Sequence, residues 1–490
     1  MNTRRLYILL RKSLLVCVIL GIAAPLYAQD IPLTTQSDEA KTLFVEGRTL
    51  FDNLRFDEAR KVFDEALQKD PQFALANVYR ALSSTTDSDF VRHLSEAVSV
   101  KSEVSDGERL LIESVKANAD NEPQKALVKL EEALETHPND KRLHHMLGLA
   151  YQGVDMNEKA EQAYKKATEI DSNFAPPYNN LGYLYRSTEN YVMAEEAFKN
   201  YIRLLPDEAN PHDSIADLYT KMGNHDLAIT HYEKALELNP NFYFSQQKIG
   251  DNLIFKGLYE DGREAYRTAM EIAPSETNKI FIQQGMANSY LYEGNHERAS
   301  IENMNAIKMA EQASLPENAS TLYQLRALMD IEQNRFEDAE QSLMACDKIM
   351  SNHTLTDNRQ HTLKVMSTKN RAIKAAKQGD FDKANEKATK LKEWAQENEN
   401  TNEMEDYHLL AGIIALEKGE YANAVTELEQ ADKNSPYAQF YLATSYQQAD
   451  MTEKARQLFT KIAKWNENSA EYALVRNRAE EAAKMDMVVE

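Results

Sequence analysis

Through the middle of this chain a small residue, followed four positions later by a large apolar or aromatic one, recurs every 34 residues, with polar residues between them. A large side chain four residues after a small one lies on the same face of a helix, so each step predicts an amphipathic helix packed closely on a neighbour. Repetition at this period predicts a solenoid, in which each unit contacts only its neighbours. The small positions are Ala126, Ala160, Ala194, Ala228 and Gly262, and the large ones are Leu130, Tyr164, Phe198, Tyr232 and Tyr266.

Each step also predicts a preceding helix and a stop. The preceding helix places a large residue, a small one and a tyrosine on one face, as at Leu147, Gly148 and Tyr151. Proline lacks an N–H donor and restrains the residue before it, so it stops a helix. Prolines follow four of the second helices, at Pro138, Pro206, Pro240 and Pro274. Each unit is therefore predicted to be helix, turn, helix and stop.

The order of these residues resembles the tetratricopeptide repeat (TPR), whose signature is W-x2-L-G-x2-Y, then A-x3-F, then P. The tryptophan position is held here by His144, Tyr178 and His212. The resemblance is strongest over residues 107–276 and is good again over 40–73 and 405–435. It implies an all-α fold, a right-handed α-α superhelix (TPR solenoid) of about twelve helix-turn-helix units.

The same pattern gives a domain organisation. Residues 74–106 keep nearly the repeat length but lose its anchors, and after residue 276 the steps lengthen, which we interpret as longer helices or extra turns. The predicted segments are a signal peptide (1–28), a short leader (29–39), N-terminal TPR units (40–106, the second degenerate), a regular block of five units (107–276), irregular longer units (277–404), C-terminal units (405–468), and a capping helix with a tail (469–490).

The N-terminus has the features of an export signal. Basic residues precede an apolar run over residues 14–24, and Ala28 provides a small residue for cleavage. The run is too short to span a bilayer, and no later stretch approaches that length. We therefore expect an exported chain, periplasmic or secreted, that begins after Ala28 and has no membrane span of its own. An uncleaved N-terminal anchor is the alternative.

Composition excludes several classes of partner. The chain has 56 Lys and Arg against 78 Asp and Glu, a net charge of −22. This acidity disfavours nucleic acid, whose phosphates need basic residues, and anionic membrane surfaces. Removal of the signal peptide takes Cys17 and leaves Cys346 alone, so no intramolecular disulfide is expected.

No motif points to catalysis, a cofactor or a metal. Phosphate-binding glycine loops, H-E-x-x-H, C-x-x-C and the nucleophile elbow G-x-S-x-G are all missing from the sequence. Two E-x-x-H pieces end at His296 and His408; the first lies in a predicted turn and the second in the aromatic packing position, so we interpret both as structural. The chain is therefore predicted to be no enzyme, with no catalytic, cofactor-binding or metal-binding residues.

The TPR resemblance implies that ligands bind the concave face, which is lined mainly by the first helix of each unit. Carboxylates there suggest a protein or peptide ligand, with a basic peptide as one candidate; the alternative is a solvated face with no ligand. The implied binding residues are His145, Asn179, Tyr183, Arg186, Asp213, Asp217, Phe244, Gln247 and Asp251.

Two blocks of opposite charge follow. Residues 359–392 hold ten Lys or Arg against three Asp or Glu, and residues 393–432 hold eleven acidic residues against one basic residue. We expect the blocks to face each other across adjacent units and neutralise. The alternative is a secondary basic patch around Lys369 and Lys377 that docks an acidic partner.

These observations favour a non-catalytic scaffold of the cell envelope that holds a peptide or protein segment in its concave groove. An accessory subunit of an envelope secretion, assembly or polysaccharide-export machine is the second hypothesis. A third, from another class, is an enzyme with an unrecognised site in residues 277–404.

Overall fold

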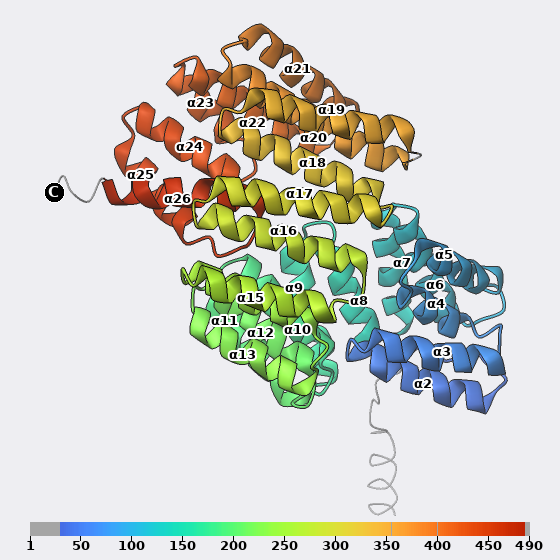
Figure 1. Ribbon diagram of the computed structural model, residues 1–490. Coiled ribbons are helices and arrows are strands. Elements are labelled where there is room, and N and C mark those ends of the chain that lie inside the picture. Colours follow the sequence, from blue (N-terminus) through green and yellow to red (C-terminus); the bar gives the residue numbers. More distant parts are fainter. Residues whose placement is uncertain (1–29, 354, 399, 486–490) are drawn as a thin grey trace, which may run out of the picture. The chain divides into compact units, whose positions relative to one another are not determined.

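The computed structural model describes residues 30–353, 355–398 and 400–485, and the predicted signal peptide lies outside them. The described part contains helices and turns but no strand. Twelve helix pairs follow one another there, and a single helix ends the series (Figure 1). The prediction of an all-α TPR solenoid of about twelve helix-turn-helix units is confirmed.

The chain divides into two compact units, with the boundary between Ser214 and Ile215. Unit 1 denotes the described residues up to 214, and unit 2 denotes those from 215 onward. The helices of unit 1 are α2 (Asp38–Asp52), α3 (Phe56–Lys69), α4 (Ala74–Leu82), α5 (Asp87–Ser99), α6 (Asp106–Ala119), α7 (Pro123–Thr136), α8 (Lys141–Gln152), α9 (Asn157–Ile170), α10 (Pro176–Ser187) and α11 (Tyr191–Leu204); α12 (Ala209–Lys221) contains the boundary.

Unit 2 continues the pairing with longer helices. Those from α16 to α19 have 17 residues each and α20 has 21, against 14 in α13 and α15. These lengths account for the stretched spacing in the sequence. The helices are α13 (His225–Leu238), α14 (Tyr243–Phe255), α15 (Tyr259–Ile272), α16 (Glu276–Tyr292), α17 (His296–Gln312), α18 (Pro316–Glu332), α19 (Phe336–Asn352), α20 (Asp357–Lys377), α21 (Phe381–Glu397), α22 (Thr401–Glu417), α23 (Tyr421–Leu428), α24 (Pro436–Gln448), α25 (Thr452–Ala463) and α26 (Ala470–Met485).

The small residues of the repeat allow an aromatic ring from the paired helix to lie directly on the backbone. A Cβ atom placed on Gly148 would lie 2.4 Å from a ring carbon of Tyr164, and one on Gly182 would lie 2.4 Å from a ring carbon of Phe198. Both rings are fully buried. The close approach needs a residue without a side chain, so these contacts fix how the two helices of a pair meet.

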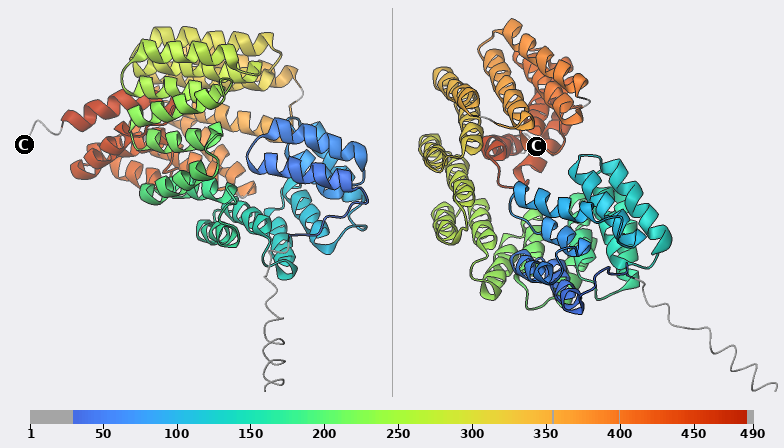
Figure 2. Two further views of the ribbon diagram at one scale, coloured as in Figure 1. Left: turned by 90° about the horizontal axis from the view of Figure 1, so that it is seen from below. Right: turned by 90° about the vertical axis from the view of Figure 1, so that its right-hand side faces the viewer.

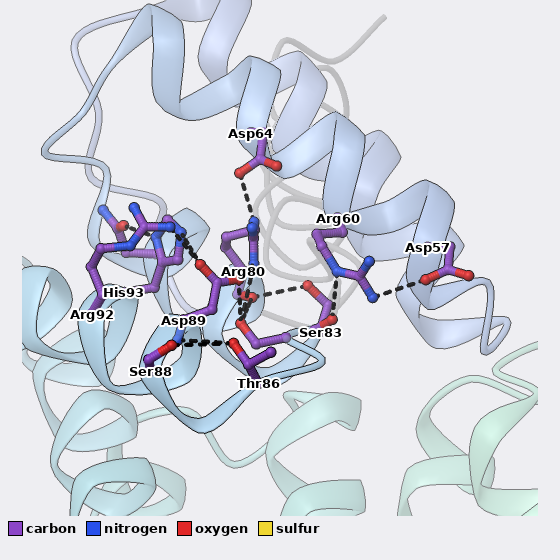
Figure 3. A network of polar contacts seen from close by, with 12 residues as sticks. Asp57, Arg60, Asp64, Arg80, Ser83, Thr86, Ser88, Asp89, Arg92 and His93 are labelled. Carbon is purple, nitrogen blue, oxygen red and sulfur yellow. Dashed lines mark hydrogen bonds and ion pairs between the residues drawn. The ribbon is translucent and has the colours of Figure 1, made fainter. Parts of the chain in front are cut away.

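A polar network holds the degenerate second repeat together (Figure 3). Arg80, which is 6% exposed, donates to the carboxylates of Asp64 and Asp89, each at 2.6 Å. Hydrogen bonding to Arg80 holds the pKa of Asp89 well below its usual range. His93 Nδ1 lies 3.0 Å from Asn77 Oδ1 in the same network. Ion pairs and hydrogen bonds thus contribute to the stability of the second repeat, in which the usual apolar anchors are missing.

The N-terminal strap, residues 30–37, is tied to unit 1 by carboxylates. Ile31 N–H donates to Asp140 at 2.8 Å, and Thr34 N–H donates to Glu108 at 2.8 Å. The hydroxyl of Thr35 donates to Asp70 at 2.5 Å. The Ile31 side chain is buried in the core of this unit. These residues belong to the predicted leader, which therefore packs against the repeats.

Candidate peptide-binding groove

A groove of about 580 Å³ opens in unit 1. Helices α2, α4, α6, α8 and α10 all line it, so it runs along the first helices of five consecutive repeats. A concave, mostly apolar site with a few polar groups is the usual form of a ligand pocket. The groove therefore is the candidate functional site of unit 1.

One part of the groove wall is apolar and open to water. Phe56, Leu82 and Leu149 line the groove and keep 39%, 38% and 44% of their surface exposed. Burial of such side chains by a ligand is favourable at about 25 cal/mol for each Å² removed from water. This wall is therefore suited to aliphatic or aromatic side chains.

The polar part of the wall offers a hydrogen-bond acceptor. Asn179 Oδ1 is buried and has no hydrogen-bond partner among the described residues. A buried acceptor without a partner costs free energy, which a ligand N–H group would recover. His145 Nε2 lies 2.8 Å from Asn180 Oδ1, and burial lowers the pKa of His145, which favours its neutral form.

The charged residues of the groove are already paired. Arg142 donates to Asp52 at 2.8 Å and to Asp30 at 3.3 Å. With His145 neutral, the groove wall carries no excess of carboxylates toward a ligand. Its chemistry is apolar with amide hydrogen-bonding groups, which the composition of the whole chain does not indicate.

The structure brings two of the predicted residues into this groove and places two others nearby on α10. His145 and Asn179 line the groove. Tyr183 packs edge-on against Phe198, and the Arg186 guanidinium lies 4.9 Å from the centre of the Tyr183 ring. Asp213 lies partly exposed on α12, at the end of unit 1.

Two of the four predicted residues of unit 2 are buried. Gln247 and Asp251 are only 5% and 3% exposed, and burial raises the pKa of Asp251. Asp251 accepts hydrogen bonds from the Tyr266 hydroxyl and the Asn468 amide, both at 2.7 Å. The interpretation of Gln247 and Asp251 as part of an open binding face is therefore wrong, because both side chains are buried, and Asp251 is covered by Asn468 from a distant segment of the chain.

The remaining two residues are more accessible. Asp217 is partly exposed and accepts a hydrogen bond from the Tyr232 hydroxyl at 2.6 Å. Phe244 is 47% exposed and stacks on Tyr243 with ring centres 4.2 Å apart. Without Asp251, the predicted row of three open carboxylates does not exist, so the basis for a basic ligand is lost.

Lys369 and Lys377 form no exposed basic patch. Lys369 Nζ lies 2.6 Å from Asp406, in the acidic block, as neutralisation across adjacent units predicts. Lys377 instead pairs at 3.4 Å with Glu332, outside that block, and its side chain is 13% exposed. Both ammonium groups are satisfied within the protein, which contradicts the alternative of a docking patch.

The described residues contain neither a metal-binding cluster nor a membrane-spanning helix. No group of three or more His, Cys, Asp or Glu side chains there is arranged to hold a metal ion. No described helix combines the length and the apolar character needed to cross a bilayer. His408 Nδ1 lies 2.8 Å from Glu427, which gives it a structural partner.

Comparison with known families supports the repeat assignment directly. Models of the tetratricopeptide repeat match residues 44–91, 141–174, 175–208, 214–242 and 415–479. Among proteins with curated functions, none matches this chain significantly.

Several solved structures are similar over part of the chain. A MamA crystal structure is 24% identical, covering 34% of this chain and 91% of its own, with a TM-score of 0.31. A tetratricopeptide repeat protein from Parabacteroides merdae is 15% identical, covering 58% and 99%, with a TM-score of 0.35. YrrB, described as a TPR protein with an unusual peptide-binding site, is 22% identical, covering 38% and 94%, with a TM-score of 0.29.

Proposed function

This chain is a tetratricopeptide-repeat protein, and we propose that it is a non-catalytic scaffold whose unit 1 groove binds a peptide segment of a partner protein. The observation that carries this proposal is the combination, in one groove, of exposed apolar side chains with the unpartnered acceptor Asn179 Oδ1. The family models match residues 44–91, 141–174 and 175–208 of the region that forms the groove, and α6 and α7 lie between these matches.

The groove favours a peptide with apolar anchors. Leu82, Leu149 and Phe56 supply the surface against which leucine or aromatic side chains of the peptide pack. A peptide N–H donates to Asn179 Oδ1, which orients the backbone. Since Arg142 and Asp52 neutralise each other, a strongly basic stretch gains no special advantage here.

The test uses a displayed random-peptide library selected on the purified full-length chain, followed by fluorescence anisotropy with a selected peptide. Leu149→Arg places a charge on the apolar wall and is expected to lower affinity at least about tenfold. Asn179→Ala removes the acceptor and is expected to lower affinity about three- to tenfold.

Val192→Arg is the matched control, because Val192 is 78% exposed on α11 and does not line the groove. It should leave affinity within about twofold of the unmodified chain. Equal losses in the Leu149 and Val192 variants, or selected peptides without apolar anchors, would contradict binding in this groove.

We also propose that the chain is exported to the cell envelope, on the strength of its N-terminal sequence. Cell fractionation with N-terminal sequencing tests this: export predicts an envelope or secreted protein that begins near Gln29. An intact Met1 in the cytoplasmic fraction would contradict it. Copurification with several subunits of one envelope machine would favour the accessory role over a single-partner scaffold.

A further inference from the structure

The last helix of unit 2 contacts repeats far from its place in the sequence. α26 lies beside α24 and α25, as a terminal cap does (Figures 1 and 2), but it also packs on α16 and α18. α18 belongs to the repeat three pairs before α24–α25, and α16 belongs to the repeat four pairs before it. A cap needs only its neighbouring repeat, since contacts in a solenoid are between neighbours. The additional contacts call for another explanation.

The segment before α26 is held by polar groups of three earlier helices. The Asn468 amide donates to Asp251 at 2.7 Å and to the Tyr266 hydroxyl at 3.0 Å. The Asn288 side-chain amide in turn donates to the side-chain oxygen Oδ1 of Asn468 at 3.1 Å. One side chain thus meets donors and acceptors that α14, α15 and α16 hold in place.

The first half of α26 places an aromatic ring and a cation against the ends of α14 and α16. Tyr472 is fully buried and meets the Tyr292 ring edge-on, with ring centres 5.7 Å apart. Arg476 donates to the backbone oxygen of Phe255 at 3.2 Å and lies 5.6 Å from the centre of its ring. Asn477 donates to the backbone oxygen of Tyr292 at 3.0 Å.

These acceptors share one property. Phe255 and Tyr292 are the last residues of α14 and α16, where carbonyl groups lack partners within the helix and carry partial negative charge. Side-chain donors from a neighbouring helix satisfy such carbonyls, and a cation is favoured there. Arg476 and Asn477 therefore both bind the C-terminal carbonyl groups of first helices, α14 and α16, from two successive repeats.

α26 also contacts the end of α18, where the last residue, Glu332, carries a full negative charge. Arg478 donates to Glu332 at 2.8 Å, and the Glu332 side chain is 2% exposed. The hydroxyls of Tyr437 and Tyr441 also donate to Glu332, at 2.7 and 2.8 Å. The last residues of three successive first helices, α14, α16 and α18, thus each accept a hydrogen bond from a side chain of α26.

We propose that this face of unit 2 is a helix-binding site that the chain's own C-terminal segment occupies as an internal ligand. The partner it fits is a helix with an aromatic residue followed, four and six positions later, by arginines, as in Tyr472, Arg476 and Arg478. Residues 465–469 form no helix, so α26 is joined to α25 by a short irregular link. A tethered ligand acts at an effective concentration of about millimolar, which a partner helix must overcome. This site does not depend on the groove of unit 1.

The test measures binding of a fluorescein-labelled peptide of residues 466–485 to the full-length chain by anisotropy. In the Arg476→Ala/Arg478→Ala chain the internal ligand is weakened, so the peptide should bind at least about tenfold more tightly than to the unmodified chain. Arg267→Ala/Arg456→Ala removes two arginines that pair with acids on α15 and α25, and should leave the affinity unchanged.

A peptide with Arg476→Glu and Arg478→Glu should bind neither chain. The proposal is overturned if the weakened chain binds no more tightly than the unmodified one, or if the charge-reversed peptide binds equally well. Hydrogen exchange on the unmodified chain gives a second measurement that needs no variant to fold. Exchange of α26 amides before those of α16 and α24 supports an internal ligand, and exchange together with α16 and α24 overturns it.

Discussion

Equivalent positions of the repeat have opposite surroundings in the two units. Leu149 on α8 keeps 44% of its surface open and lines the groove of unit 1, whereas Asp251, at the same repeat position on α14, is 3% exposed beneath Asn468. His145 and Gln247 form a second such pair, half-buried and buried. A concave position therefore identifies a binding residue only when no other part of the chain covers it.

The largest expected effect tests what fills unit 2. Tyr472→Ala removes a fully buried ring between Phe255 and Tyr292 and should lower the free energy of unfolding of unit 2 by about 3 to 5 kcal/mol. Hydrogen exchange resolved by segment is the measurement. Protection should fall first in α16, α24 and α26. Unchanged protection of α16 would mean that α26 adds nothing to its stability.

Unit 1 is expected to be vulnerable at its polar network. Arg80→Met should lower its free energy of unfolding by about 2 to 3 kcal/mol, because Asp64 and Asp89 lose a buried partner. Arg92→Met is the matched control: Arg92 also pairs with Asp89 but is 60% exposed, so its loss should change stability by less than about 0.5 kcal/mol. Segment-resolved exchange of α4 and α5 distinguishes the two, and equal losses would contradict the network's role.

Asp251→Asn should stabilise unit 2 near neutral pH by about 1 kcal/mol. Burial raises the pKa of Asp251, so its contribution to stability is full at acid pH and is lost as the pH rises through the folded value. Asparagine keeps an oxygen to accept from Tyr266 and Asn468. Urea unfolding at pH 7.5 and pH 4 should show the gain only at the higher pH. Asp217→Asn, at the equivalent and partly exposed position, should show little gain; a loss of stability in the Asp251 variant at pH 7.5 would refute the argument.

A smaller pH effect of the opposite sign is expected in unit 1. Burial lowers the pKa of His145 and of His93, so the unfolded chain takes up protons first as the pH falls. Their contribution is complete above about pH 6.5 and is lost below it, by less than about 1 kcal/mol for each histidine down to pH 5.5. The difference between the urea midpoints at pH 7.5 and pH 5.5 should therefore be smaller in His145→Gln than in the unmodified chain. His353→Gln, at an exposed position, should not change the difference between the two midpoints.

The sequence predicted the helix pairs because their determinants are local. Gly148 and Tyr164 belong to one repeat, and their small and large side chains recur at each step, so periodicity alone indicates the contact. Pairing between neighbouring repeats could also be predicted from charge, as Lys369 with Asp406 shows.

The sequence pattern does not indicate contacts between distant repeats. Asn468 and Asp251 are 217 residues apart, and nothing in either residue's own repeat indicates the other. The same is true of Arg478 and Glu332, which are 146 residues apart. Periodicity therefore predicted which side of each helix faces inward but not which inward faces are filled. Part of the groove chemistry was missed because Leu82 lies in the second repeat, which lacks the anchors of the consensus.

The N-terminal strap bears on how shortened versions of this protein should be designed. Asp140 begins α8 by accepting from the Arg142 N–H at 2.8 Å with one oxygen, and it holds Ile31 with the other. A version that starts at the first residue of α2, Asp38, would look complete by its helices, yet Asp140, Glu108 and Asp70 would each lose a donor. The proper starting point for expression is therefore Asp30 or earlier, and a purification tag is better fused ahead of that residue than in its place.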